Sequence, residues 1–414
     1  MLTSNSVIRA IEKRLGQRRL FYVCRDIERA ADLQAKNYFI ITNNTAYAKK
    51  LARQDPNIIL IKRKNQSRRK VGIQTVTSGL IDTIDLLNHP RAKQTVRKND
   101  FVLVFKNNSL IEKVCQKNCW RLLNPPAALA DKIESKISQI AWLGKLTKYL
   151  APHYINICQN IKWTGKPFIL QFNRAHTGSG TLFINSKKKL NELAAKFPRR
   201  EVRISRYIKG PVFTNNNVVW DKKVLMGNIN FQITGLRPFT DNKFATIGND
   251  WALPTRLLRN KQIKQYEQIV NNVGKKLATE GWKGLFGLDI IMEQKTNRLY
   301  LLEINARQPA STTFESRLQK SKVQSPKSKV STFEAHVAAL LGLPYQKQSL
   351  IKIYDGAQII QRVTKKNIKI PKIKDRSLIN TIKYNNTLPG SDLIRWQFSR
   401  GVMKKDSMLD KKII

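Results

Sequence analysis

The sequence has few of the residues that bind transition metals. Its 414 residues include four cysteines and four histidines, and no two histidines lie within one helical turn or at alternate positions of a strand. Only Cys115 and Cys119 are close together, and no second pair or histidine is near them, so we expect free thiols rather than a zinc site. Any metal ion should therefore have oxygen ligands.

Long hydrophobic runs are also absent. No segment approaches the ~20 apolar residues that a membrane span needs. Residues 1–15 carry charges where a signal peptide would have an apolar core. These absences predict a cytoplasmic protein with no membrane partner. Hydrophobic residues still make up 41% of the chain, which is enough for a packed core, and its length predicts two or three subdomains.

Acidic residues are scarce relative to basic ones. The chain has 28 Asp and Glu against 76 Lys and Arg, a formal net charge of +48. Such an excess raises the affinity for phosphate-rich polymers through counterion release. The basic residues are spread along the whole chain, and no zinc finger, RRM-type or basic-zipper pattern occurs. Any nucleic-acid partner is therefore expected to bind through non-specific charge.

Strand-like and helix-like segments alternate over residues 1–125. Short apolar runs such as RLFYVC, YFIIT, NIILI and DFVLVF are separated by helical patterns such as IERAADLQAK and SLIEKVCQKN. This order predicts an N-terminal βαβ domain with a parallel sheet. The Gly-rich dinucleotide fingerprint is missing after each strand, so we expect a scaffold or a substrate-side domain.

Residues 126–345 are predicted to form a mixed α+β domain. A helix is predicted to begin at Asp131, with Glu134 completing a capping box. Lys132 and Lys136 lie one turn apart on it, away from the apolar stripe, so both can face one ligand. Strands FILQF and TLFIN flank the loop NRAHTGSG, and a long helix is expected over 260–280. Residues 346–414, with 16 basic against 5 acidic residues, read as a basic β-rich extension, a lid or appendage.

One predicted hairpin gathers oxygen-bearing side chains. If GLDIIM and LYLLEIN pair around a turn centred on Thr296, Asp289 lies directly opposite Glu303, and Asn305 shares their face. Opposed carboxylates repel one another, so a cation such as Mg²⁺ is expected between them. Such sites commonly complete the coordination shell with substrate phosphates. The alternative is that both carboxylates lie on a solvated face and pair with lysines.

These motifs occur in the order seen in a known family. The segment GLDIIMEQKTNRLYLLEINAR, the segments DKIESK and FILQFNRAHTGSGT, and RYIKG at 206–210 resemble parts of the ATP-grasp fold. The resemblance covers about residues 125–345, and it implies two α+β subdomains that enclose a nucleotide.

The resemblance assigns roles to individual residues. It implies that ATP and Mg²⁺, or Mn²⁺, are bound, with the metal held by Asp289, Glu303 and Asn305. Arg307 would contact the substrate carboxylate or its acyl phosphate, because a guanidinium matches either group bidentately. The alternative for Arg307 is an ordinary surface arginine. The residues implied for the nucleotide are Lys132, with Lys136 as the alternative, then Gln171, Gly178, Ser179, Gly180, Thr181, Tyr207 and Ile208.

The activity that the resemblance implies is ATP-dependent ligation. A small-molecule carboxylate would be activated as an acyl phosphate and attacked by an amine or another nucleophile. The sequence departs from the family pattern in two places. Gln171 stands where many members have a lysine, and Ser205 and Arg206 stand where a glutamate is usual. A catalytically degenerate nucleotide-binding or basic nucleic-acid-binding protein is therefore the alternative.

Overall fold

The computed structural model describes residues 6–62, 80–173, 180–321, 329–364, 370–384 and 386–413. Gly178 and Ser179, both expected at the nucleotide, lie outside these ranges. Among the described residues, no helix is long and apolar enough to cross a membrane.

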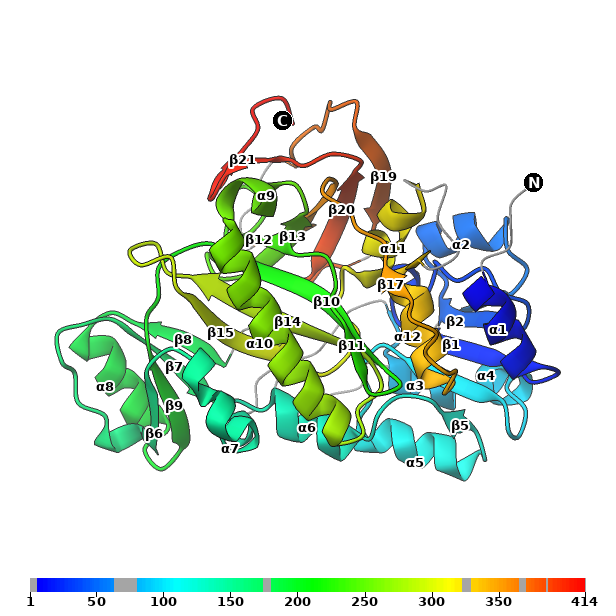
Figure 1. Ribbon diagram of the computed structural model, residues 1–414, viewed down its shortest axis with the longest axis horizontal. Helices are drawn as coiled ribbons and strands as arrows, with labels where there is room; N and C mark the ends of the chain where they lie inside the picture. The colour runs from blue at the N-terminus through cyan, green and yellow to red at the C-terminus, as the bar shows by residue number, and fades with distance from the viewer. Residues whose placement is uncertain are drawn as a thin grey trace.

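A five-stranded parallel sheet forms the N-terminal part, as predicted, and lies at the right of Figure 1. Its strand order is β3-β2-β1-β4-β5. The chain adds β2 and β3 on one side of β1 and then adds β4 and β5 on the other side, so the strand order reverses between β1 and β4. Side chains pointing to opposite faces of these strands form two apolar clusters. The strands are β1 (Leu20–Cys24), β2 (Tyr38–Asn43), β3 (Ile58–Ile61), β4 (Phe101–Val104) and β5 (Arg121–Leu122).

Helices cover this sheet, with one departure from the sequence prediction. The segment IERAADLQAK contains only the 3-10 turn η1 (Ile27–Arg29), where a helix was expected. Leu20 to Cys24 and Tyr38 are buried on either side of it, so this short crossover is folded closely against the sheet. The helices are α1 (Ser6–Leu15), α2 (Ala46–Ala52), α3 (Thr83–Asn88), α4 (Pro90–Thr95) and α5 (Ser109–Lys117).

A small antiparallel sheet with one covering helix forms a separate lobe, at the lower left of Figure 1. Its strand order is β6-β9-β7-β8. One face packs its apolar side chains, including Leu170 and Ile204, against α8, and the other face is left for the site. The elements are β6 (His153–Ile157), β7 (Phe168–Phe172), β8 (Thr181–Ile184), α8 (Lys187–Lys196) and β9 (Glu201–Arg206).

A nine-stranded sheet occupies the centre of the molecule. Its order is β15-β14-β10-β12-β13-β18-β20-β19, with β11 paired to β10, and its pairs are antiparallel. The last three strands of this path come from residues 357–398, so the C-terminal region extends the central sheet rather than forming a lid or appendage. The strands are β10 (Val212–Trp220), β11 (Lys223–Leu225), β12 (Asn230–Thr234), β13 (Thr246–Asp250), β14 (Gly284–Met292), β15 (Leu299–Asn305), β18 (Ala357–Arg362), β19 (Leu378–Lys383) and β20 (Asp392–Phe398).

The two faces of the central sheet differ in character. One face is apolar and packs against α10 (Asn260–Thr279), which lies across the sheet in Figure 1. The other carries buried polar side chains that continue from strand to strand: Thr214 is opposite Asp289 and Asn230, and Gln358 is opposite Asn249 and Gln397. Helix α12 (Thr332–Leu340) joins this sheet to the N-terminal sheet, with Phe333 against Tyr22.

The helix predicted to begin at Asp131 begins earlier and is broken. Helix α6 (Ala127–Glu134) starts after Pro126, and the chain bends before α7 (Ser138–Leu143). Lys132 lies on α6 and Lys136 in the bend, so the two lysines are not on one continuous helix. The remaining elements are η2 (Gly144–Tyr149), η3 (Cys158–Asn160), α9 (Leu253–Leu257), α11 (Thr312–Ser321), β16 (Lys329–Val330), β17 (Ser349–Leu350), β21 (Met403–Lys405) and β22 (Met408–Leu409).

Candidate functional site

The opposed carboxylates lie at the edge of the central sheet. Asp289 on β14 is paired with Glu303 on β15, as the sequence predicted. Near the turn the register is different, because Ile290 pairs with Leu301, so Leu302 is an extra residue in β15. This β-bulge brings Glu303 opposite Asp289.

Asn305 and Thr214 complete the oxygen-rich face. Asn305 Nδ2 lies 3.4 Å from Asp289 Oδ2, and Thr214 on β10 also hydrogen-bonds the Asp289 carboxylate. Burial and the nearby charge of Glu303 raise the pKa of Asp289 to about 6. The partly buried carboxylates of Asp289 and Glu303 therefore repel each other. A bound hard cation would relieve this repulsion.

Basic side chains surround this face. Lys136 Nζ lies 2.8 Å from Glu303 Oε1. Burial alone would raise the pKa of Glu303, but Lys136, Arg307 and Lys106 together hold it below its usual value. Arg307 donates a 2.8 Å hydrogen bond to Asn305 Oδ1, so it contacts the same face as the carboxylates.

Glu134 holds two of these cations. Its carboxylate lies 2.5 Å from Lys106 Nζ, which follows β4, and 3.3 Å from Arg307 Nε. Helix α6 thus links the N-terminal sheet to the end of β15. Sequence reasoning treated Glu134 only as a capping residue, and the structure places it as the anion that orients Arg307.

Of the two lysines expected at the phosphates, only Lys136 lies in this cluster. Lys132 is 54% exposed along its side chain, and its Nζ lies 3.3 Å from Glu280 at the end of α10. Contrary to the prediction from the sequence, the two lysines do not share one helix face, because the helix ends at Glu134. The chain then turns, and the backbone N–H of Lys136 donates to Asn173 O after β7.

The residues expected around a nucleotide lie on the neighbouring lobe. Gln171 on β7 is opposite Thr181 on β8, and Gln171 Nε2 donates to Thr181 Oγ1 at 3.1 Å. Gly180 immediately precedes Thr181, and its carbonyl accepts a hydrogen bond from the N–H of Phe172. These described residues place the ends of β7 and β8 beside each other.

Tyr207 and Ile208 lie in the connection between β9 and β10. The Tyr207 ring is 4.7 Å from that of Phe183 on β8, between ring centroids. Ile208 is buried in a small apolar cluster with Ile291 and Tyr300 of the central sheet. This connection therefore joins the lobe to the central sheet through apolar contacts.

Sequence reasoning missed two residues beside Arg307. The Arg29 guanidinium carbon lies 4.9 Å from the centroid of the Phe105 ring, and that of Arg307 lies 5.6 Å from the same centroid. Arg29 follows β1 and Phe105 follows β4, which are the two strands between which the sheet order reverses. Ligands of open α/β sheets bind at this place, so the position of Arg29 after β1 was a usable signal.

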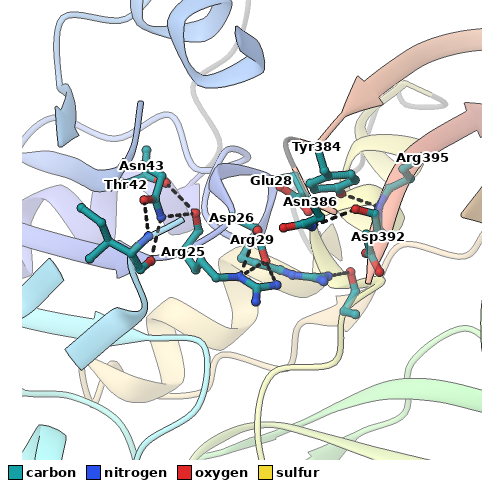
Figure 2. Close-up of polar contacts among 12 residues, drawn as sticks. Arg25, Asp26, Glu28, Arg29, Thr42, Asn43, Tyr384, Asn386, Asp392 and Arg395 are labelled. Atoms are coloured by element: carbon teal, nitrogen blue, oxygen red, sulfur yellow. Dashed lines mark hydrogen bonds and ion pairs between the residues drawn. The ribbon is translucent and has the colours of Figure 1, made fainter. Parts of the chain in front are cut away.

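A polar network connects this region to the C-terminal strands (Figure 2). Tyr384 donates to Glu28 Oε1, and Arg395 Nε donates to Tyr384 Oη at 2.9 Å. Arg395 also lies 3.1 Å from Asp392. Arg29, which is next to Glu28 in the chain, donates to Ala310 O. The C-terminal region therefore contacts the segment after β1, and Arg29 of that segment contacts the chain beyond β15.

The comparisons with known proteins agree with this architecture. Residues 133–311 match the family model for an ATP-grasp domain. The structure is similar to N5-carboxyaminoimidazole synthetase from Staphylococcus aureus complexed with ADP, with 12% identity, a TM-score of 0.59 and coverage of 96% of this chain and 94% of that chain. No curated protein matches the chain.

Two further solved structures share the fold. An L-amino acid ligase from Bacillus licheniformis is 12% identical, with a TM-score of 0.60 and coverage of 93% of this chain and 94% of that chain. A carboxyaminoimidazole ribonucleotide synthase from Aspergillus clavatus, complexed with ATP, is 16% identical, with a TM-score of 0.58 and coverage of 92% and 93%. Residues 133–311 therefore match an ATP-grasp domain, and the chain as a whole shares the fold of these solved structures.

Proposed function

We propose that the protein is an ATP-dependent ligase that activates the carboxylate of a small molecule for attack by an amine or another nucleophile. The observation that carries this proposal is the pairing of Asp289 with Glu303. Asn305 lies beside the two carboxylates, Lys136 pairs with Glu303, and Arg307 donates to Asn305. Two carboxylates and an amide oxygen are the ligands that Mg²⁺ and Mn²⁺ prefer.

The residues present fit a metal-bound nucleotide. The raised pKa of Asp289 reflects a buried, repelled carboxylate that a divalent ion would stabilise. Asp289, Glu303 and Asn305 would hold the ion, which supplies neutralisation of phosphate charge when bound. Lys136, Gln171, Gly180 and Thr181, with Gly178 and Ser179, would bind the phosphates. Tyr207 and Ile208 would contact the adenine. Lys132, which pairs with Glu280, is left out of the proposed set.

The substrate carboxylate would bind between Arg307 and Arg29. Both guanidiniums contact the Phe105 ring, and Arg307 also reaches Asn305 beside the metal ligands. A carboxylate held there would be on the side of Arg307 that leads, through Asn305, to the proposed metal ligands. Its oxygen would take the γ-phosphoryl group as ADP leaves. The nucleophile would then attack the carbonyl carbon, and inorganic phosphate would leave.

Little covalent chemistry falls to the chain itself in this scheme. Arg307 and Lys136 neutralise negative charge as the phosphoryl group moves, and Glu134 keeps Arg307 in its orientation. The contacts of Glu134 with both Lys106 and Arg307 also connect the N-terminal sheet to the phosphoryl site.

An ATP-consumption screen across amino acids and small carboxylic acids tests the proposal. ADP and phosphate should appear only when a suitable acid and a nucleophile are present, and the Asp289→Ala and Glu303→Ala variants should abolish the signal. If Mg²⁺ and ATP give no thermal stabilisation of the wild-type protein, and both variants leave every binding property unchanged, the ligase proposal fails.

A further inference from the structure

The centre of β9 carries a charged side chain that is buried. Arg203 lies between Val202 and Ile204, which point into the apolar cluster of the lobe, and alternation places Arg203 on the opposite face. The residue is only 2% exposed. Burying a guanidinium costs several kcal/mol unless an anion or hydrogen-bond acceptors compensate it.

Two donor atoms of Arg203 lack a hydrogen-bond partner among the described residues. Its Nε and Nη1 atoms are buried and have no hydrogen-bond partner there. Burial lowers the pKa of Arg203 to about 10, and the carboxylate of Glu303 acts in the opposite direction. Glu303 is already paired with Lys136 at 2.8 Å. The guanidinium of Arg203 is therefore influenced by the charge of Glu303, and its Nε and Nη1 donors have no partner in the part of the chain that the structure describes.

The strand register shows which residues share the face of Arg203. Arg203 is directly opposite Gln171 on β7, and Gln171 is directly opposite Thr181 on β8. Directly opposed residues point to the same side of a sheet, so the three form one row across three strands. The amide of Gln171 is held by Thr181 and carries no charge. Arg203 supplies the positive charge of this row.

The same face is fixed relative to Lys136. Asn173, two residues after Gln171, accepts from the N–H of Lys136 through its carbonyl and from the N–H of Ile137 through Oδ1 at 2.9 Å. The bend that carries Lys136 is thus attached to the end of β7. Lys136 and Arg203 approach Glu303 from different elements, and only Lys136 is paired with it.

We propose that Arg203 binds the phosphate groups of the nucleotide and is the main cation of the lobe for this purpose. This inference rests on the proposed nucleotide site. A planar guanidinium with unpaired N–H groups matches phosphate oxygens bidentately. An anion at this place would also remove the cost of burying an unpaired charge. The row Thr181, Gln171 and Arg203 then provides hydroxyl, amide and guanidinium donors to one polyphosphate.

Calorimetric titration of the full-length protein with Mg²⁺ and ATP, ADP or adenosine tests the inference. Arg203→Gln keeps much of the side-chain volume and removes the charge. Its affinity for ATP and ADP should fall by about 10- to 100-fold, with adenosine affinity unchanged. Arg203→Lys keeps the charge but lacks the parallel N–H donors of a guanidinium. Its affinity for ATP and ADP should lie between the affinities of the wild type and Arg203→Gln. Arg200→Gln is the matched control, because Arg200 stacks on Phe172 with its guanidinium carbon 4.3 Å from the ring centroid.

Thermal unfolding without ligand guards against a folding defect. Because Arg203→Gln removes a buried unpaired charge, its melting temperature should equal or exceed that of the wild type, and tripolyphosphate should stabilise the wild type alone. Equal ATP affinity in wild type and Arg203→Gln would overturn the assignment while leaving the nucleotide site intact. A wild-type protein that binds no ATP overturns both the assignment and the proposed function. An equal loss of adenosine affinity would assign Arg203 a structural role instead.

Discussion

At the scale of single residues, Asp289 is the carboxylate whose protonation is most sensitive to a bound ion. Its pKa is raised from 3.8 to about 6 by burial and by Glu303. Below that pH the group is protonated and no longer a good metal ligand. Stabilisation of the protein by Mg²⁺ and ATP should therefore weaken as the pH falls from 7.5 to 5, which differential scanning fluorimetry can follow. A ligand-induced shift that is constant over this range would contradict the assignment.

Removing the Asp289 charge should stabilise the ligand-free protein. The folded state binds this proton more tightly than the unfolded chain between pH 3.8 and about 6, so the contribution of Asp289 to stability falls as the pH rises through this range and stays unfavourable at pH 7. Asp289→Asn should gain on the order of 1 kcal/mol at pH 7 and lose the response to Mg²⁺. Asp221→Asn, in the turn between β10 and β11, is the control and should change neither property.

The two lysines near α6 give a matched pair of substitutions. Lys136→Ala removes the partner of Glu303 and should weaken ATP binding about tenfold or more, which corresponds to about 1.4 kcal/mol. Lys132→Ala removes an exposed pair with Glu280 and should leave the affinity unchanged. Titration calorimetry on both variants measures the difference. The reverse result would restore the arrangement predicted from the sequence.

At the scale of secondary-structure elements, the periodicity of apolar residues predicted more of the structure than the helix-capping pattern did. Alternation and turn residues were sufficient for the parallel sheet, the β14–β15 hairpin and α10, because each buries one continuous apolar face. The capping-box pattern at Asp131 was misleading, since Pro126 begins α6 and the bend after Glu134 follows from tertiary contacts with Asn173. The boundaries proposed at residues 125 and 345 remain predictions.

The site was predictable where local geometry determines it. Asp289 and Glu303 are joined by one hairpin, so their proximity follows from the sequence with only the bulge at Leu302 unforeseen. Arg203 and Arg29 reach the site from elements distant in the chain, and no local pattern shows which strands become neighbours. An arginine between two apolar residues, as in VRISRYI, was the available signal for Arg203.

The connection between β9 and β10 depends on one glycine. A Cβ at Gly210 would lie 1.8 Å from Met292 O on β14. Gly210→Ala should therefore displace the connection that carries Tyr207 and Ile208, costing about 2 kcal/mol or more and weakening adenosine binding. Gly165→Ala is the control, because its Cβ meets nothing within 4 Å and only its positive φ opposes the change. Urea midpoints and adenosine titrations compare them, and equal losses would contradict this role.

At the scale of the whole molecule, the net charge of +48 acts separately from the site. The cluster around Asp289 and Glu303 combines acids and bases at short range, whereas the excess of lysine is spread over the entire chain. Interactions of the first kind are partly buried and weakly screened by salt. Those of the second kind are exposed and strongly screened at physiological ionic strength. The salt dependence of binding therefore distinguishes a ligase with a basic surface from a protein whose function is to bind nucleic acid.

Binding of a random-sequence DNA duplex makes this distinction measurable. The wild-type protein should bind the duplex, and the logarithm of its affinity should fall steeply and linearly with the logarithm of the salt concentration. This dependence is expected because counterion release drives the binding. Asp289→Asn should bind DNA equally well while losing the response to Mg²⁺ and ATP, and saturating Mg²⁺ and ATP should not displace the duplex. If nucleotide competes with DNA, or the substitution changes DNA affinity at every salt concentration, the polymer occupies the candidate site itself. The nucleic-acid-binding alternative would then replace the ligase proposal, since non-specific surface charge cannot depend on one carboxylate of the β14–β15 hairpin.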